Sequence, residues 1–327
     1  MSSLTVLVSS AGRRAALVAA LRHGAEVLGV GLRVLATDIV PLTAAGHLAD
    51  ELHLVPRVGS PELVPTLLEL CRAKEVDVLV PTIDTELPVL AAARQSFAEI
   101  GTTVSVSDPE VVSICADKAS SSRWLAANGF PVPRQWKPEE AAQLPSGCWP
   151  LFFKPRRGSS SVGAHRVTDL ADLSRAVADH PDGVVEELCV GDEYTMDCWV
   201  DATGRCRAVV PRLRLETRAG EVSKGMTVAS TELDALCRSI AEALPGARGT
   251  ITMQAICTPQ GPRVIEINPR FGGGYPLSHH AGAWFTAALL AEAAGRPVPD
   301  DWFGWRDGTV MLRFDEAVFL DRSQVGL

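Results

Sequence analysis

The side chains best suited to chemistry lie on two short segments near the C-terminal end, residues 251–258 and 262–270. Pro259-Gln260-Gly261 stands between them and predicts a three-residue hairpin loop, with glycine at the position that needs a left-handed backbone. In this register Thr258 faces Pro262, and Gln254 lies opposite Glu266. Because opposed residues of an antiparallel pair share a face, Gln254 and Glu266 are predicted side by side.

Residues two apart on a strand also share a face, so Asn268 joins that pair, whereas Ile265 and Ile267 point into a core. Carboxylate and amide oxygens suit magnesium, which is usually held by one or two carboxylates together with phosphate oxygens and water. The hairpin therefore predicts a metal site formed by Gln254, Glu266 and Asn268. Arg270 follows on the same alternation and could clamp an anion beside the metal. The alternative is a surface hairpin whose polar face meets water.

The composition is that of a globular chain of two or three domains: 327 residues, 46% hydrophobic and 21% charged, with a net charge of −8. That charge argues against nucleic acid or an anionic membrane as the main partner. No apolar run reaches transmembrane length, and the first residues lack the basic start of a signal peptide. Eight scattered cysteines without a CxxC pair favour a reducing, cytoplasmic location.

Residues 1–107 alternate apolar strand patterns with amphipathic helix patterns, which predicts a parallel sheet covered by helices. Functional loops of such sheets lie at the carboxyl ends of the strands, here Ser9–Arg14, Asp38 and Asp84–Glu86. Turn formation or helix capping is an equally good interpretation of Asp38 and Asp84. Arg13 and Arg14 would start a helix, where cations are unfavourable, and this favours anion binding slightly.

A second unit, residues 108–187, contains a strand that ends at Lys154 and is followed by a glycine- and serine-rich loop, 156–163. Such a loop lets the backbone approach a ligand and offers amide and hydroxyl donors to phosphate oxygens. It is not a Walker A motif, and a hairpin tip without a ligand is the alternative.

The third unit, residues 188–327, holds a predicted antiparallel pair, 193–201 and 205–210, continued by 212–217. A polar loop is predicted over 218–226, and a helix over 232–244 before the hairpin. His279 and His280 are adjacent on a helix, point in different directions, and make a poor metal pair.

Four motifs in this order resemble the ATP-grasp enzymes, closest to the carbamoyl-phosphate-synthase and biotin-carboxylase branch. They are Asp117-Lys118 with Leu125–Pro133, Phe153-Lys-Pro with Gly158–Gly163, Glu186–Glu193, and Glu266-Ile-Asn-Pro-Arg270. The resemblance covers nearly the whole chain. It implies a mixed α/β and α+β architecture: an N-terminal Rossmann-like parallel-sheet domain (1–107) and two α+β lobes (108–187 and 188–327) that sandwich ATP.

The resemblance also implies roles for single residues. Lys118 and Lys154 would hold the nucleotide phosphates, under a loop formed by Ser159, Ser160, Ser161, Val162 and Gly163. Glu186, Glu187 and Leu188 would meet adenine, and Glu193 the ribose. Gln254, Glu266 and Asn268 match the magnesium positions, with Mn²⁺ as a substitute, although other branches have an acid at the position of Gln254. Arg270 would meet the transferred phosphoryl group, with Lys154 and Asn268 as further catalytic residues.

The implied reaction is ATP-dependent ligation, in which a small carboxylate becomes an acylphosphate that an amine converts to an amide, with release of ADP and phosphate. Arg212, Arg214 and Lys224 are predicted to orient the carboxylate, and Asp84 or Glu86 the ammonium group; ordinary ion pairs explain these charges about as well. One alternative is a bicarbonate-activating carboxylase or carbamoyl-phosphate-forming enzyme. Another is a nucleotide-binding regulatory protein without turnover. The expected partners are the two small substrates, and the sequence leaves a homodimer open.

Overall fold

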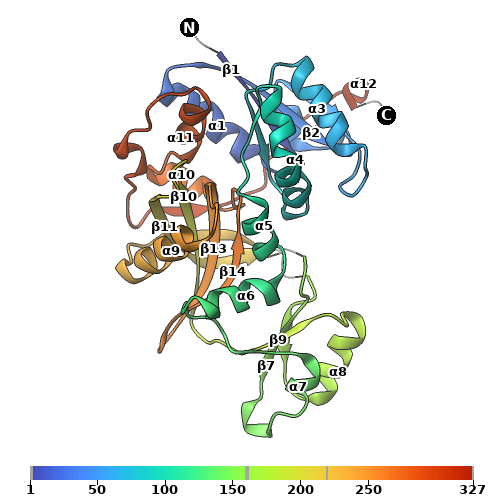
Figure 1. Cartoon of the computed structure of the whole chain (residues 1–327), viewed down its shortest axis with the longest axis vertical. Coiled ribbons are helices and arrows are strands. Elements are labelled where there is room, and N and C mark those ends of the chain that lie inside the picture. Colours follow the sequence, from blue (N-terminus) through green and yellow to red (C-terminus); the bar gives the residue numbers. More distant parts are fainter. Residues whose placement is uncertain (1–2, 159–161, 219, 326–327) are drawn as a thin grey trace.

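The computed structural model describes residues 3–158, 162–218 and 220–325 and contains three β-sheets with helices around them. In Figure 1 the N-terminal sheet lies at one end of the molecule, the small sheet at the other, and the large antiparallel sheet between them. The predicted fold class is confirmed. The predicted boundaries at 107 and 187 stay predictions.

The N-terminal sheet is parallel, with strand order β3-β2-β1-β4-β5, as the alternating pattern predicted. Its central strands are almost fully buried runs of valine and leucine, which is typical of a sheet covered on both faces. The elements of this unit are β1 (Ser3–Ser9), α1 (Ala15–Leu28), β2 (Gly31–Asp38), α2 (Ala44–Leu48), β3 (Glu51–Leu54), α3 (Leu63–Ala73), β4 (Val78–Pro81), α4 (Leu87–Glu99) and β5 (Thr103–Val104).

Two helices lead into a small lobe built on a four-stranded sheet of order β6-β9-β7-β8. Asp117 caps the second helix by accepting hydrogen bonds from the amides of Ala119 and Ser120, which fixes Lys118 at its first turn. The elements are α5 (Pro109–Cys115), α6 (Lys118–Ala127), β6 (Gln135–Trp136), α7 (Pro138–Ala141), β7 (Leu151–Lys154), β8 (His165–Val167), α8 (Leu170–Asp179) and β9 (Val184–Glu187).

The large sheet is antiparallel and six-stranded, in the order β14-β13-β10-β11-β12-β15. The predicted polar loop over 218–226 is wrong, because Glu221–Thr227 forms strand β12 between β11 and β15. Its charged residues misled the prediction, since alternate positions of this strand face outward. The elements are β10 (Asp192–Val200), β11 (Cys206–Arg218), β12 (Glu221–Thr227), α9 (Thr231–Ala243), β13 (Gly249–Thr258), β14 (Gly261–Asn268) and β15 (Val310–Leu312).

The C-terminal helices α10 (Tyr275–Ala281) and α11 (Phe285–Ala293) pack against α1 of the N-terminal unit, and Figure 1 shows them side by side. Gly24 of α1 allows this close approach, because a Cβ there would lie 2.7 Å from the Thr286 hydroxyl. One apolar core therefore spans both chain ends and includes Val8, Trp199 and Phe285. A short helix, α12 (Arg322–Val325), follows. Among the described helices, none is long and apolar enough to cross a bilayer.

Candidate active site

Gln254 on β13 lies opposite Glu266 on β14, as predicted, but the hairpin reaches this register differently. The loop has two residues rather than three, since Thr258 pairs with Gly261 and Cys257 with Pro262. A β-bulge between Gln254 and Ala255 then restores the predicted pairing. The predicted core position of Ile265 is wrong, because the bulge brings this residue to a cavity, whereas Ile267 is buried as predicted.

Two cavities meet at this hairpin. One, of about 240 Å³, lies between the small lobe and the large sheet. The other, of about 280 Å³, lies between the large sheet and the carboxyl edge of the N-terminal sheet. Gln254 and Glu266 line both cavities, so a group held at these two side chains is within reach of ligands on either side. The cavities are named here the lobe cavity and the acceptor cavity.

Lys154, at the end of β7, connects the two walls of the lobe cavity. Its ammonium group lies 2.8 Å from a Glu186 carboxylate oxygen and donates a hydrogen bond to the Ile265 carbonyl, at 3.1 Å. The Lys154 and Glu186 side chains are only 7% and 4% exposed, so each depends on the other for charge compensation. Gln135 donates a further hydrogen bond to Glu186. Lys154 is thus held rigidly with its charge in the cavity.

Lys118 enters the lobe cavity from α6, where its ammonium group donates to the Gly158 carbonyl at 2.8 Å and lies 3.6 Å from Glu266. Arg156 pairs with the capping residue Asp117 and so ties this helix to the glycine-rich loop. The lobe cavity therefore contains two ammonium groups, those of Lys118 and Lys154, each close to a carboxylate. This arrangement can hold a polyanion such as a triphosphate.

The loop after β7 was predicted to close over phosphates, and this stays a prediction. Val162 is 73% exposed and lines the lobe cavity. Gly163 instead packs close to His180 and Pro155, with φ of +75°. Ser159, Ser160 and Ser161 lie outside the described residues. Glu186, Glu187 and Leu188 line the cavity on its opposite side, as predicted for the adenine-binding segment.

Arg214 on β11 joins the two cavities by contacts with residues of both. Its guanidinium lies 3.1 Å from Glu193, donates to the Gln254 side chain at 3.3 Å, and donates to the Gly220 carbonyl at 3.0 Å. Burial raises the pKa of Glu193, and nearby Glu266 adds to this, while Arg214 opposes it. Arg214 is thus positioned by protein groups and orients Gln254 and Glu193.

Arg270 and Arg212 both line the acceptor cavity, as predicted, and both have protein partners. Arg270 pairs with Asp84 at 2.7 Å. Arg212, only 1% exposed, pairs with the buried Asp197 at 2.9 Å, so most of its charge is compensated from behind the cavity. Asp84 therefore orients Arg270 through one oxygen, whereas its buried Oδ1 has no hydrogen-bond partner among the described residues, and its contact with an ammonium group stays a prediction.

Two predicted substrate residues lie elsewhere. Glu86 is 1% exposed and accepts hydrogen bonds from the Ser9 and Ser10 hydroxyls, so it supports the β1–α1 turn from beneath; burial raises its pKa. Lys224 pairs with Glu216 on the outer face of the large sheet, where its side chain is 50% exposed. It does not line either cavity, because strand β12 turns it outward.

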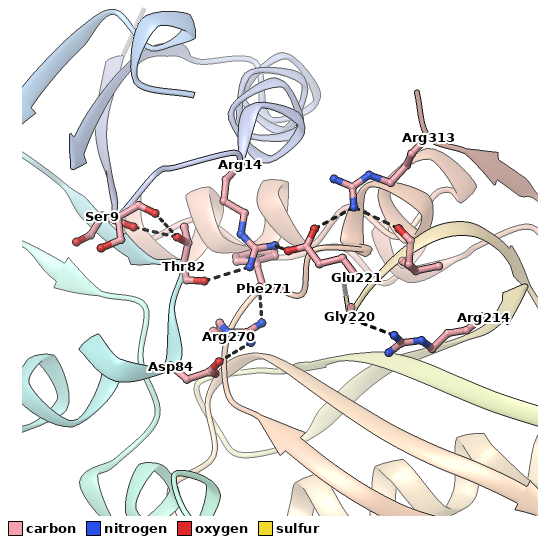
Figure 2. A network of polar contacts seen from close by, with 12 residues as sticks. Ser9, Arg14, Thr82, Asp84, Arg214, Gly220, Glu221, Arg270, Phe271 and Arg313 are labelled. Atoms are coloured by element: carbon pink, nitrogen blue, oxygen red, sulfur yellow. Dashed lines mark hydrogen bonds and ion pairs between the residues drawn. The ribbon is translucent and has the colours of Figure 1, made fainter. Parts of the chain in front are cut away.

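The acceptor cavity also contains residues that were missed or only weakly indicated by the sequence. Arg14 donates to the Thr82 carbonyl, and Glu221 lies between Arg14 and Arg313, at 3.9 and 3.1 Å (Figure 2). The glycine run 272–274 permits close approach, since a Cβ on Gly274 would collide with the Arg212 guanidinium. The unfavourable position of Arg14 at the start of α1 was the one available signal.

The metal prediction fits the donor chemistry of the site. Gln254, Glu266 and Asn268 line the acceptor cavity together, and these oxygens suit a hard cation that also binds phosphate. The described residues hold no cluster of three His, Cys, Asp or Glu side chains, so a dedicated all-protein cage is absent from them. Two of these side chains also have basic partners, because Lys118 reaches Glu266 and Arg214 reaches Gln254.

Comparison with known families agrees with this geometry. Residues 6–105 match a family described as the PylC-like N-terminal domain, and residues 115–274 match the ATP-grasp domain. The chain contains an ATP-grasp domain, preceded by a PylC-like N-terminal domain. The domain match of this ATP-grasp chain includes Lys118, Lys154 and the hairpin through Arg270.

Curated relatives of this ATP-grasp chain are ligases. A 3-methyl-D-ornithine–L-lysine ligase of Methanosarcina acetivorans is 28% identical over 274 residues, covering 82% of this chain and 69% of the relative. Its Methanosarcina barkeri counterpart is 29% identical, and the chain spans 62% of its length. A D-alanine–D-alanine ligase of Corynebacterium glutamicum is 28% identical, covering 81% of this chain and 84% of that protein. The predicted enzyme class, an ATP-grasp carbon–nitrogen ligase, is confirmed.

Solved structures share the fold at low identity. The biotin carboxylase domain of a Hydrogenobacter thermophilus 2-oxoglutarate carboxylase, solved with MgADP and bicarbonate, has a TM-score of 0.71 at 18% identity, covering 90% of this chain and 70% of that chain. An N5-carboxyaminoimidazole synthetase of Staphylococcus aureus has a TM-score of 0.68 at 16% identity, with 92% and 80% covered. The predicted branch likeness is confirmed at the level of fold, and ATP with Mg²⁺ is the expected pair of cofactors.

Proposed function

We propose that this ATP-grasp ligase activates a small, amino-acid-like carboxylate in the acceptor cavity and joins it to an amine. The single observation that supports this most is that Gln254 and Glu266 line both cavities. The lobe cavity offers Lys118 and Lys154 to a nucleotide, and the acceptor cavity offers arginines to an acid. The terminal phosphate and the carboxylate would therefore meet at the shared hairpin.

The proposed reaction has two steps. A carboxylate oxygen attacks the γ-phosphorus, and the bond from this phosphorus to the ADP oxygen breaks. The amine nitrogen then attacks the acyl carbon, the nitrogen loses a proton, and the bond from that carbon to the phosphate oxygen breaks. Catalysis of phosphoryl transfer consists mostly of positioning and charge stabilisation. Lys154 and Arg270 would stabilise the negative charge from opposite sides of the hairpin.

Glu266, Asn268 and Gln254 would hold magnesium, which when bound neutralises charge on the phosphates; Mn²⁺ is proposed as a substitute. Asn268 is 8% exposed, so its side chain is held by the surrounding protein as a metal ligand must be. The precise set of metal ligands, a homodimeric state and a cytoplasmic location stay predictions. Light scattering on the purified chain tests whether it is a homodimer.

Nucleotide product analysis tests the function. The purified chain is incubated with ATP, Mg²⁺ and pools of acids and amines, and products are scored by chromatography and mass spectrometry. ADP and phosphate beside a condensed product would support the proposal. AMP and pyrophosphate would overturn the acylphosphate mechanism. ADP released with bicarbonate alone would instead indicate the carboxylase-type activity, and ATP binding without turnover in any pool would favour a regulatory role.

A further inference from the structure

The acceptor cavity is lined by more positive than negative side chains. Six arginines and three acids line it, although two of the arginines pair with carboxylates outside this lining. The arginines are Arg13, Arg14, Arg212, Arg214, Arg270 and Arg313, and the acids are Asp84, Glu221 and Glu266. Such an excess in a partly desolvated cavity favours a ligand that brings negative charge.

Three of these arginines are balanced one to one by protein carboxylates. Arg212 pairs with Asp197, Arg214 with Glu193, and Arg270 with Asp84. Glu266 in turn has Lys118 at 3.6 Å. These pairs lie on the half of the cavity nearest the hairpin, where a reacting carboxylate is expected.

On the other half, Arg13, Arg14 and Arg313 share Glu221, and Asp84 adds an attraction to Arg14 alone. Arg313 lies 3.1 Å from it and Arg14 only 3.9 Å, and Figure 2 shows the carboxylate between the two guanidiniums. Burial lowers the pKa of Arg14, and the charge of Arg270 lowers it further. Burial alone would raise the pKa of Glu221, but Arg14, Arg313 and Arg13 hold it below its usual value. This half is therefore short of anions.

Buried donor groups around the same cavity also lack partners. Among the described side chains, Arg212 Nη1, Arg214 Nε and Arg270 Nε are buried without a hydrogen-bond partner. The side chains of Arg212 and Arg214 are only 1% and 8% exposed. Because an unpartnered buried donor is costly, such groups indicate a site completed by a ligand or water.

We propose that the acid bound in the acceptor cavity carries a second anionic group, held by Arg13, Arg14 and Arg313, while its reacting carboxylate lies near Arg270. This inference rests on the proposed function for the identity of the reacting end. A cavity of about 280 Å³ lies just below the range of drug-sized sites, so the ligand is a small acid. The substrate class is an acidic amino acid, with a carboxylate or a phosphate as the second group.

Paired ligands test the inference by isothermal titration calorimetry, with Mg²⁺ and a non-hydrolysable ATP analogue present. The pairs are aspartate with asparagine, glutamate with glutamine, and phosphoserine with serine, each nearly equal in shape except for the second charge or phosphate. We expect one acid to bind at least about tenfold more tightly than its neutral partner. The pair with the largest ratio distinguishes a carboxylate from a phosphate.

Variants then locate the second anion. Arg14→Gln and Arg313→Gln should each reduce the ratio of the affinity for the acid to that for its neutral partner about tenfold. Arg22→Gln is the matched control, since Arg22 lies on helix α1, which Arg14 precedes as the N-cap residue, but pairs with Asp50 on the surface. A preference that survives both cavity substitutions would overturn the inference, as would tighter binding of neutral or cationic amino acids.

A separate assay of ADP release keeps the two proposals apart. If the preferred acid binds and loses affinity in the arginine variants, but no amine gives ADP, the second-anion inference stands and the ligase function fails. If only amino acids with neutral or cationic side chains give ADP, the ligase function stands and the second-anion inference fails.

Discussion

Arg270 and Asp84 lie 2.7 Å apart although 186 positions separate them in the chain. Arg270 follows strand β14 of the large sheet, and Asp84 follows strand β4 of the N-terminal sheet. The pair joins the carboxyl edge of one sheet to the hairpin of the other, and Figure 2 shows it beneath Arg14. The acceptor cavity is thus formed by both units, and the orientation of Arg270 depends on their packing.

Arg270→Lys should lower turnover about 100-fold or more and change the ATP dissociation constant less than about threefold. Lysine keeps the charge but loses the planar fork that binds oxygen pairs, and removal of one preorganised hydrogen-bond donor costs about 100-fold or more in kcat in other enzymes. Asp84→Asn should have a milder effect, within about tenfold, because Arg270 keeps its guanidinium. Steady-state kinetics and direct ATP titration check both; unchanged turnover in Arg270→Lys would remove its proposed role.

Lys154→Met should both destabilise the fold and abolish tight ATP binding. The substitution leaves Glu186 buried without its cation, which costs about 3–5 kcal/mol of unfolding free energy. Adding Glu186→Gln should restore most of the stability but not the ATP affinity. Urea unfolding and nucleotide titration separate the effects. Recovery of ATP binding in the double variant would show that Lys154 acts only on the fold.

Arg214→Gln and Lys224→Gln form a contrasting pair on adjacent strands. Arg214 orients Glu193 and Gln254, so its loss should weaken ATP binding about tenfold. Lys224 is half exposed and pairs with Glu216, so its loss should leave turnover within about twofold. The test is kcat and KM for ATP in both variants. Equal effects would mean that Lys224 reaches the cavity after all.

His279 should make the fold sensitive to mild acid. Burial lowers its pKa from 6.5 to about 4, with His23 and His280 adding to the effect. Its Nε2 lies 3.0 Å from His23 Nδ1, and its Nδ1 lies 3.2 Å from the Tyr275 hydroxyl. The unfolded chain binds a proton near pH 6.5, but the fold resists protonation down to about pH 4. The contribution of His279 to stability is therefore full above pH 6.5 and declines as the pH falls towards 4.

Unfolding by urea at several pH values between 4 and 7.5 checks this expectation. The wild-type free energy of unfolding should fall with pH more steeply than that of His279→Gln, which has no proton to gain. His47→Gln provides a comparison, because His47 donates from Nε2 to the Pro41 carbonyl and does not contact His279. Parallel curves for wild type and His279→Gln would contradict the assignment.

The sequence located the hairpin, the lysines and the metal face because these depend on local spacing. Alternation along β14 fixes that Glu266 and Asn268 share a side whatever the loop length, whereas Arg270 lies in the bend after the strand. The residue that lies opposite Glu266 on β13 was harder to predict, since the pairing depends on the length of the hairpin loop. The two-residue turn and the bulge shift the register in opposite directions, so Gln254 still lies opposite Glu266.

Charge patterns predicted the substrate residues less well. Lys224 and Glu86 have suitable charges, yet one faces solvent and the other lies under a turn. The strand identity of 221–227 was missed for the same reason, because polar residues on a strand with an exposed face read as a loop. The type of a side chain alone does not indicate which face of a helix or strand lines the cavity.

The sequence by itself thus predicted the ATP-grasp resemblance, the parallel N-terminal sheet and the pairing of Gln254 with Glu266, because each follows from short-range patterns. Only the tertiary structure decided the acceptor cavity. Arg14 comes from the first unit, whereas Glu221 and Arg313 come from distant segments of the third, and they meet because the start of α1, β12 and the segment after β15 converge. Such contacts depend on how sheets and helices pack, and no local spacing encodes them.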